Sequence, residues 1–340
     1  SRSSAASDVY KRQDEYLVSQ NTPNALVETI KCFAGLIIKT SKLIEEAPLN
    51  NKLGKLEQEN IQGEQQTILD VEINSLFVKD LKKTESVIGL VSEELEMPIY
   101  FNKKRTKEQH IVFFDPLDGS SNVSSNVSVG SIFSVYKINH EAPIEIKDFL
   151  QKGKNQIAAG FSVFGPSTIL VLTLGAGTFK FCYDSVTNEF ICTQKNILIP
   201  EETEEFSINM SNKRFWSDST KIYISDCQYG AKGPRKKNFN MRWIASLVAD
   251  INRIIVKGGI YLYPLDKKNM KTGGRLRLMY EINPMAMIIE QCNGTCSDGF
   301  NRILEITPKD IHQRVAVCAG AKKEVDVVKN YNLRHKNLEI

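Results

Sequence analysis

A succession of short apolar runs between residues 87 and 193 constrains the fold of this chain more than any other feature. The runs are rich in β-branched and aromatic residues, and each is shorter than a typical helix. They predict strands at 87–91, 111–114, 131–136, 156–164, 169–174, 178–183 and 190–193. Gly and Asp or Asn residues separate the last three runs, which is typical of antiparallel hairpins.

Helical periodicity precedes this strand-rich region. Apolar residues recur every three or four positions over residues 24–46, which predicts an amphipathic helix. A second helix is expected at 70–83. The stretch between them, 50–64, is polar, contains two glycines and has little periodicity, so it is expected to be a mobile loop.

The C-terminal part alternates between the two kinds of pattern. Helices are expected at 242–256 and 283–292, and strands at 259–263 and 275–280. The acidic segment 201–205 marks an expected boundary between two halves. The chain is therefore predicted to be α/β (α+β), with layered sheets and helices. Its expected parts are an N-terminal tail at 1–23, a first half at 24–205 and a second half at 206–340.

Charge and hydrophobicity give no sign of a nucleic-acid or membrane partner. The 340 residues contain 44 Lys plus Arg and 40 Asp plus Glu, so the net charge is only +4. The basic run 232–237 is expected to be an exposed loop. No run approaches the roughly 20 apolar residues that cross a bilayer, and residues 1–14 lack the apolar core of a secretory signal. We expect a cytoplasmic protein.

The cysteines also fit an intracellular protein. There are seven, and no two have the CxxC spacing of a metal site or redox motif. Reduced thiols are the expected state. A disulfide or a redox switch is the alternative.

The segment 113–121 carries the strongest chemical signal. An apolar strand ends in Asp115 and Asp118, which are separated by Pro-Leu and followed by Gly119, Ser120 and Ser121. Two carboxylates on one turn suit Mg²⁺, which prefers oxygen ligands. Backbone N–H groups at Gly and Ser can approach a phosphate closely.

Further acidic residues stand at the ends of other expected elements. Glu93 and Glu94 follow the strand at 87–91, residues 64–70 lead into a helix, and Glu281 follows the strand at 275–280. Each could be a solvated surface group. Together they fit a site where two or three divalent ions neutralise a phosphate and activate water.

These motifs resemble those of the class 1 fructose-1,6-bisphosphatase family. Segment 115–121 resembles the signature of the magnesium-dependent, lithium-sensitive sugar phosphatases, a superfamily that includes inositol monophosphatases. Longer matches point to one family and occur in order along residues 24–325. They are 63–70, 91–94, 115–122, 259–264, 275–281, 283–286 and 310–314.

The resemblance implies a five-layered α-β-α-β-α sandwich and a homotetramer. The implied reaction is hydrolysis of the 1-phosphate of fructose 1,6-bisphosphate to fructose 6-phosphate and phosphate, in gluconeogenesis. The implied cofactor is Mg²⁺, for which Mn²⁺ or Zn²⁺ can substitute. The metal ligands carried over by motif are Glu64, Glu93, Asp115, the carbonyl of Leu117, Asp118 and Glu281. Glu64 stands where many members have Asp.

The resemblance also assigns roles around the reaction. Asp70 and Glu94 would orient and deprotonate the attacking water. The reacting phosphate would lie against Asp118, Gly119, Ser120 and Ser121. The other phosphate would be held by Asn209, Tyr263 and Arg275, with Arg242 reaching in from a neighbouring subunit. Asn212, which stands where some members have Tyr, and Arg277 are further expected substrate-binding residues.

Two other functions stay open. Sedoheptulose-1,7-bisphosphatase shares the metal chemistry, although 261–264 and 281–285 look more like the fructose enzyme. A non-catalytic sugar-phosphate sensor on the same fold would be expected to lose acidic residues, and this chain keeps them.

The resemblance finally predicts weak inhibition by AMP. In animal members, AMP binds at the start of the first long helix, through a Thr-rich turn, a Lys-Tyr pair and an Arg. The matching positions here are 23–27, Gln109-His110 and Lys137. Pro23 has no N–H to donate, and Lys137 cannot form a two-pronged contact with phosphate. Thr22 could substitute in part if the register shifted by one residue.

Overall fold

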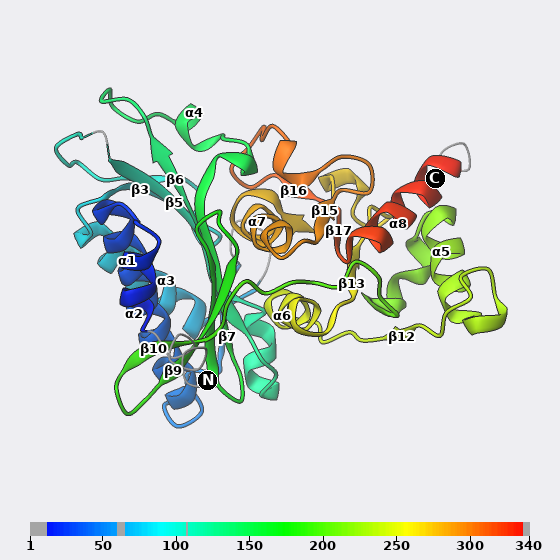
Figure 1. Ribbon diagram of the computed structural model, residues 1–340. Coiled ribbons are helices and arrows are strands. Elements are labelled where there is room, and N and C mark those ends of the chain that lie inside the picture. Colours follow the sequence, from blue (N-terminus) through cyan, green and yellow to red (C-terminus); the bar gives the residue numbers. More distant parts are fainter. Residues whose placement is uncertain (1–11, 60–64, 107, 336–340) are drawn as a thin grey trace, which may run out of the picture.

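The computed structural model describes residues 12–59, 65–106 and 108–335, with side chains for all of these except 55–59 and 65 (Figure 1). An eight-stranded sheet forms its larger half, in the order β10-β9-β8-β7-β6-β5-β3-β4. β3 and β5 pair in parallel, and the other pairs are antiparallel. The strands are β3 (Val87–Ser92), β4 (Ile99–Tyr100), β5 (Gln109–Asp118), β6 (Gly130–Ile138), β7 (Gln156–Phe164), β8 (Thr168–Thr173), β9 (Thr178–Asp184) and β10 (Glu189–Gln194).

Three helices cover one face of this sheet: α1 (Gln13–Ser19), α2 (Asn24–Glu46) and α3 (Ile68–Lys83) (Figure 1). The alternation of side chains along β5 explains how one strand serves two layers. Val112 and Phe114 pack in the apolar cluster beneath α2 and α3, whereas Ile111 and Phe113 pack in the cluster on the opposite face.

A second, five-stranded sheet has the order β12-β11-β13-β17-β15. Between the two sheets lie α6 (Leu247–Lys257) and α7 (Asn283–Gln291), and beyond the second sheet lie α5 (Asp218–Gln228) and α8 (Lys322–Arg334) (Figure 1). The strands of the second sheet are β11 (Glu205–Ile208), β12 (Asn240–Met241), β13 (Ile260–Tyr263), β15 (Thr295–Ser297) and β17 (Val317–Gly320).

The apolar clusters follow the same layering. One joins α1, α2 and α3 to the large sheet, a central one joins both sheets to α6 and α7, and a third joins the second sheet to α5 and α8. The expected five-layered α-β-α-β-α sandwich is therefore confirmed. The remaining elements are short: α4 (Ile146–Phe149), β1 (Lys55–Glu59), β2 (Gln65–Thr67), β14 (Leu276–Arg277) and β16 (Arg314–Val315).

Most expected elements between residues 24 and 193 occur, with ends shifted by a few residues. The helix expected at 24–46 spans those residues as α2. The helix expected at 70–83 begins earlier, at Ile68, because Thr67 and Asp70 form a reciprocal capping box.

Three expectations were wrong. Residues 242–246 are not helical, and α6 begins at Leu247. Residues 278–280 belong to a π-helical turn, Leu278–Ile282, because their apolar side chains turn into the central core instead of extending a strand. Residues 55–59, expected in a mobile loop, form β1, which pairs with β2; this polar hairpin lacks the apolar alternation that would have indicated a strand.

All seven cysteines are free thiols, so the reduced state expected from the sequence is confirmed. They are Cys32, Cys182, Cys192, Cys227, Cys292, Cys296 and Cys318. Within the described parts of the chain, no helix combines the length and the apolar character that membrane crossing requires.

Candidate active site

A cleft of about 1390 Å³, part of it open to solvent, lies at one end of the large sheet, against the central layer. It brings together thirteen of the residues that the sequence singled out. They are Asp70, Glu93, Glu94, Asp115, Leu117, Asp118, Gly119, Ser120, Ser121, Tyr263, Arg275, Arg277 and Glu281.

The parallel pairing of β3 and β5 explains why two of these acids meet. Parallel strands end at the same edge of a sheet, so the residues that follow them are neighbours. Glu93, immediately after β3, donates its backbone N–H to the carbonyl of Phe114 at 3.1 Å. Asp115 is the next residue along β5 and is 2% exposed.

The end of β5 is irregular, and this irregularity presents its acids to the cleft. The pairing with β6 shifts between Asp115 and Asp118. The Asp115 carboxylate accepts the Leu117 N–H at 2.9 Å, and the Ser131 hydroxyl donates to the Pro116 carbonyl at 2.8 Å. A bulge of this kind re-aims side chains at the end of a strand.

Glu281 comes from the C-terminal half, on the π-helical turn Leu278–Ile282 that leads directly into α7. Single π-helical turns are rare and occur often at functional sites. Here the turn leaves Glu281 3% exposed, with its carboxylate accepting the backbone N–H of Arg277.

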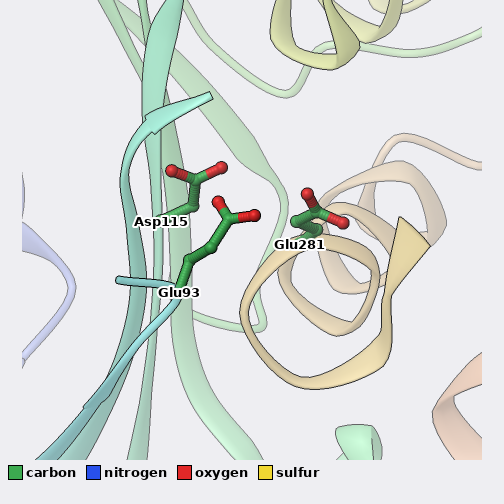
Figure 2. Close-up of side chains that lie close together, drawn as sticks. All are labelled: Glu93, Asp115 and Glu281. Carbon is green, nitrogen blue, oxygen red and sulfur yellow. The ribbon is translucent and has the colours of Figure 1, made fainter. Parts of the chain in front are cut away.

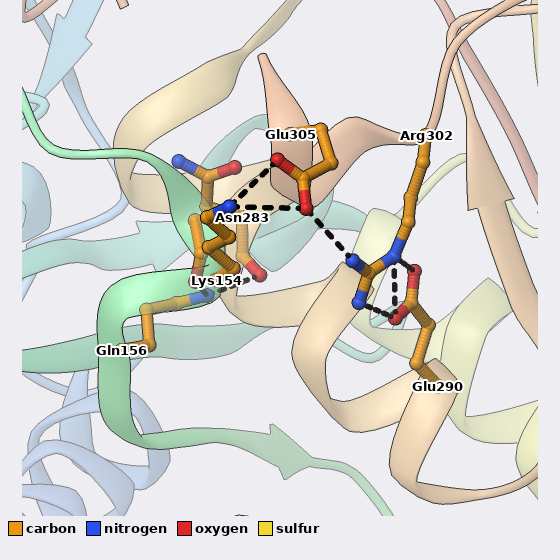
Figure 3. A network of polar contacts seen from close by, with 7 residues as sticks. Lys154, Gln156, Asn283, Glu290, Arg302 and Glu305 are labelled. Carbon is orange, nitrogen blue, oxygen red and sulfur yellow. Dashed lines mark hydrogen bonds and ion pairs between the residues drawn. The ribbon is translucent and has the colours of Figure 1, made fainter. Parts of the chain in front are cut away.

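Contacts with the large sheet fix the start of α7 (Figure 3). The Gln156 side chain donates to the carbonyl of Asn283 at 2.9 Å. Near the other end of α7, Glu290 accepts from Arg302 at 2.9 Å, and Glu305, in the 3₁₀ turn Ile303–Glu305, accepts from both Arg302 and Lys154. The turn that carries Glu281 is therefore tied to both halves.

Three carboxylates converge in the cleft (Figure 2). Oxygen atoms of Glu93, Asp115 and Glu281 all lie within 4.8 Å of one another, and all three residues are buried. Burial, followed by the charges of Glu93 and Asp118, raises the pKa of Asp115 well above its usual range. Buried like charges at this separation repel one another strongly, and a set of oxygen donors fits a divalent cation such as Mg²⁺.

Arg277 supplies positive charge inside the cluster. It is 4% exposed, and its guanidinium lies 2.9 Å from Glu93 and 3.4 Å from Glu281. A guanidinium cannot lose its proton in a protein, so Arg277 offsets part of the acidic charge. It lines the cleft beside the three carboxylates.

Asp118 connects the cluster to a helix start. Its carboxylate accepts the Val248 N–H, in the first turn of α6, at 3.0 Å. Burial and then the charge of Glu281 raise the pKa of Asp118 to about 7, although the Val248 N–H and Arg277 oppose the shift. The pKa shows that a negative charge here is costly in the protein alone.

The backbone after Asp118 forms a cradle. Gly119 has a φ of +77°, which favours Gly, and a Cβ there would lie 3.3 Å from the Ser246 hydroxyl. Ser246 is buried and lines the cleft, and its hydroxyl has no hydrogen-bond partner among the described residues. An unpaired buried hydroxyl beside a Gly-Ser-Ser turn suits a bound anion.

Glu94 and Asp70 lie at the N-terminal side of the cleft. The Glu94 carboxylate accepts from the Gln66 side chain at 2.5 Å, and its backbone N–H donates to Ser92. Asp70 is buried, and its carboxylate accepts the Thr67 N–H at 2.7 Å as part of the α3 capping box. Both acids are therefore oriented by neighbours on β2, the strand directly before α3.

Aromatic and basic side chains also line the cleft. Tyr263 and the exposed Arg275 line it, together with Trp243, whose ring stacks on Tyr261 at a centroid distance of 5.9 Å. Sequence reasoning missed Trp243 and Ser246 because residues 242–246 were expected to be helical. The only signal in the sequence was the position of Trp243 directly after Arg242.

Three expected site residues that the structure describes are not among the residues that line this cleft. Arg242 is exposed and lies 3.8 Å from Glu205. The Asn209 side chain accepts from Ser211, where it caps the 3₁₀ turn Met210–Phe215. Asn212 is buried in that turn. Glu64 lies outside the described residues.

Comparisons with known proteins agree over nearly the whole chain. The family model described as "Fructose-1-6-bisphosphatase, N-terminal domain" matches residues 9–195, and the model of the C-terminal domain matches residues 199–332. A class 1 fructose-1,6-bisphosphatase from Methylobacillus flagellatus is 43% identical over 94% of this chain and 96% of its own length. One from Polynucleobacter necessarius is 40% identical over 96% and 97%.

Solved structures give the same result. The holo form of Leishmania major fructose-1,6-bisphosphatase is similar with a TM-score of 0.89 and 34% identity, covering 96% of this chain and 99% of that one. The T-state form of that protein is similar with a TM-score of 0.82 and 32% identity, over 96% and 99%.

Proposed function

The chain belongs to the fructose-1,6-bisphosphatase family and hydrolyses fructose 1,6-bisphosphate; we propose that this reaction takes place in the cleft described above and removes the 1-phosphate. The reaction belongs to carbohydrate metabolism, including gluconeogenesis. Fructose 6-phosphate and phosphate would be the products. The observation that carries this proposal is the group of three buried carboxylates, Glu93, Asp115 and Glu281, beside a Gly-Ser-Ser turn.

The family is metal-dependent, and the acidic cluster could hold a metal ion. Mg²⁺ is the proposed ion, with Mn²⁺ or Zn²⁺ able to substitute, because the donors are carboxylate and carbonyl oxygens. A bound divalent ion would offset the charge of the phosphate and make a water molecule easier to deprotonate. The proposed ligands are Glu64, Glu93, Asp115, the Leu117 carbonyl, Asp118 and Glu281.

Glu94 and Asp70 are the proposed catalytic acids. Glu94 would take a proton from the attacking water, and its contact with Gln66 supports this by holding one carboxylate oxygen in place. Asp70 would orient the water from the start of α3, where the capping box limits its movement. General bases of this kind act over hydrogen-bond distances.

The reacting phosphate would lie over the turn formed by Gly119, Ser120 and Ser121. The left-handed conformation of Gly119 and the unpaired hydroxyl of Ser246 support this placement. Asp118, immediately before the turn, would link phosphate binding to metal binding.

The second phosphate would lie against the aromatic and basic side chains of the cleft. Tyr263 and Arg275 are among its lining residues, and Asn209 and Asn212 would approach the phosphate from the 3₁₀ turn after β11. Arg277 would act mainly by offsetting the charge of Glu93 and Glu281. Arg242 would reach the cleft of a neighbouring subunit in a cytoplasmic homotetramer, which its position outside the cleft of its own chain supports.

The test is phosphate release from fructose 1,6-bisphosphate with and without Mg²⁺, measured beside sedoheptulose 1,7-bisphosphate. We expect metal-dependent release, with a higher kcat/KM for the fructose substrate. A higher value for the sedoheptulose substrate would reassign the main substrate. The absence of release from both, in a folded protein with added Mg²⁺, would contradict catalysis in this cleft.

A further inference from the structure

A second cleft lies on the opposite side of the five-stranded sheet, between α5, α8 and residues 298–300. It encloses about 740 Å³, part of it open to solvent. Its base is formed by aliphatic side chains and a thiol, including Leu262, Val328 and Cys318. Three aromatic rings stand along its sides, those of Tyr223, Phe300 and Tyr331.

The two tyrosine rings are held in place by their own hydroxyl groups. The Tyr223 hydroxyl donates to Glu324 at 2.6 Å, and the Tyr331 hydroxyl donates to Asp226 at 2.6 Å. The rings lie 5.5 Å apart at 80°. Because the hydroxyls are engaged elsewhere, the two rings are fixed in place and contribute apolar surface to the wall of the cleft.

Asp298 is the one residue with a charged side chain among those that line this cleft in the described structure. Its carboxylate accepts the backbone N–H groups of Phe300 at 2.8 Å and Asn301 at 2.6 Å. Among the lining residues that the structure describes there is no Lys, Arg or His. The described lining therefore offers no counter-charge to a phosphate or carboxylate, which favours an uncharged ligand over a sugar phosphate or nucleotide.

One edge of the cleft is polar but uncharged. The hydroxyl of Ser217 lies 2.9 Å from that of Ser219 and 3.1 Å from that of Thr220. Hydroxyl groups can reorient to donate or accept, so this edge can satisfy one polar group of a ligand. Apolar walls with a few convergent polar groups are typical of small-molecule sites.

We propose that this cleft binds a small, uncharged, planar molecule and that its occupancy changes the affinity of the catalytic cleft for substrate. The ring of the ligand lies against Tyr223, Tyr331 and Phe300, and its polar edge meets the hydroxyls of Ser217 and Thr220. The second half of this statement rests on the function proposed above, and the first half does not.

The coupling follows from β13, which is a wall of both clefts. Tyr261 and Tyr263 line the catalytic cleft, while Leu262, between them, lines the second cleft. Successive side chains of a strand point to opposite faces. A ligand that displaces Leu262 therefore moves the strand that positions Tyr263, whose proposed role is to hold the second phosphate.

A second connection runs through the segment after β11. The Lys267 N–H donates to the Phe215 carbonyl at 3.0 Å, and Trp216 forms a β-bridge with Asp266. This links the turn capped by Asn209 to the residues after β13. Ser217, at the polar edge of the second cleft, follows Trp216 directly. The two connections lead to Tyr263 and to Asn209, which are proposed to hold the second phosphate. A ligand in the second cleft should therefore change substrate affinity more than turnover.

The binding test uses 5-fluoroindole as the probe, followed by ¹⁹F NMR with the full chain. Phe300→Ala removes an exposed aromatic wall and should weaken binding between about 2- and 10-fold. Val328→Phe fills the base from α8 and should abolish it. Leu333→Ala, an exposed residue on the same helix, is the matched control and should bind like wild type. Absence of binding to wild type, or equal binding to all four proteins, would overturn the site.

The coupling test measures KM and kcat for fructose 1,6-bisphosphate with and without saturating 5-fluoroindole. We expect KM to change by at least about twofold and kcat to change less, with no response in Val328→Phe. An unchanged KM with the probe bound to wild type would overturn the coupling. Failure of the proposed function would look different, because no phosphate would be released with or without probe while the ¹⁹F signal still reported binding.

Discussion

The two ends of β5 hold buried polar groups in opposite ways. At the start of the strand, the buried His110 ring lies 3.0 Å from the Thr29 hydroxyl, which in turn lies 2.9 Å from the Ser86 hydroxyl. At the end of the strand, Asp115 and Asp118 are buried among further carboxylates. The groups at the start of the strand pair with one another, whereas the carboxylates at its end repel one another, and Arg277 offsets only part of their charge.

Burial shifts the pKa values at both ends, with different consequences. It lowers the pKa of His110 to about 4, so the ring is neutral and its hydrogen bonds with hydroxyls suffice. It raises the pKa of Asp118 to about 7, so the protein alone does not accommodate the charge there well. A buried polar group whose partners lie within the protein is typical of a structural role, whereas buried acids with perturbed pKa values in a cleft are typical of a functional site.

The largest effect should come from a substitution at the end of β5, where the carboxylates are buried together. Asp118→Asn removes a proposed metal ligand and should nearly abolish phosphate release, a loss of several kcal/mol of transition-state stabilisation. Chelation with EDTA should do the same to wild type. Asp326→Asn, at an exposed position of α8, is the control. A phosphatase rate unaffected by EDTA would refute metal dependence.

A smaller loss is expected at the proposed base. Glu94→Gln keeps the shape and the contact with Gln66 but removes the basic oxygen, so kcat should fall about 100- to 10,000-fold while KM changes little. Steady-state kinetics at saturating Mg²⁺ measure both. Glu96→Gln, two residues along and exposed, should behave like wild type. If KM rose while kcat stayed the same, Glu94 would be a binding residue.

Arg275 should affect binding rather than turnover. Arg275→Ala removes a charge-assisted phosphate contact at the exposed end of the cleft, so KM should rise about 10- to 100-fold with kcat within about threefold. Arg275→Lys should restore most of the affinity, because Lys keeps the charge. An equal fall of kcat in both variants would place Arg275 in the chemical step instead.

We expect AMP to inhibit weakly, because the buried polar groups at the start of β5 already pair with one another. The Thr29 hydroxyl, near the start of α2, is already engaged with His110 and Ser86, and Pro23 offers no N–H. Losing several phosphate contacts of about 1.5–3 kcal/mol each leaves little affinity. A titration of activity with AMP at fixed Mg²⁺ should show weak inhibition. Strong cooperative inhibition at micromolar AMP would break the comparison between the two ends.

The smallest effect concerns stability and pH. Below about pH 6.5 the unfolded chain protonates His110, whereas the folded chain resists until about pH 4. Wild type should therefore lose on the order of 1–3 kcal/mol of stability as pH falls through this window, and His110→Gln should lose less. Chemical denaturation at several pH values measures this, with His335→Gln as control. Identical pH slopes for wild type and His110→Gln would show that the ring is accessible to protons.

The site residues that stand at the ends of strands could be predicted from the sequence. The apolar run before Glu93 and the one before Asp115 both indicated buried strands, and parallel neighbours end at one edge. Helices and strands that are mostly exposed or polar were harder to predict from the sequence. Only three side chains of α8 are buried, Glu324, Val325 and Val328, so its sequence has no strong apolar stripe, and no helix was expected there.

The remainder of the site depends on tertiary packing. The apolar residues before Glu281 suggested a strand, but the central core draws them into a π-helical turn. Trp243 and Ser246 reach the cleft because residues 242–246 cross it before α6 begins. The ion pairs of Arg277 with Glu93 and Glu281 depend on how the two halves pack, which no local pattern reports.

The carboxylate cluster has a consequence for the cohesion of the molecule. Glu93 and Asp115 lie in the segment that matches the N-terminal family model, and Glu281 lies in the segment that matches the C-terminal one. An ion bound by all three carboxylates would hold the two segments together. By mass action, an ion at 100 times its dissociation constant would contribute about 2.7 kcal/mol to keeping them together. Amide exchange in α7 should then slow when Mg²⁺ is added, and an exchange rate independent of Mg²⁺ would show that the halves hold together without it.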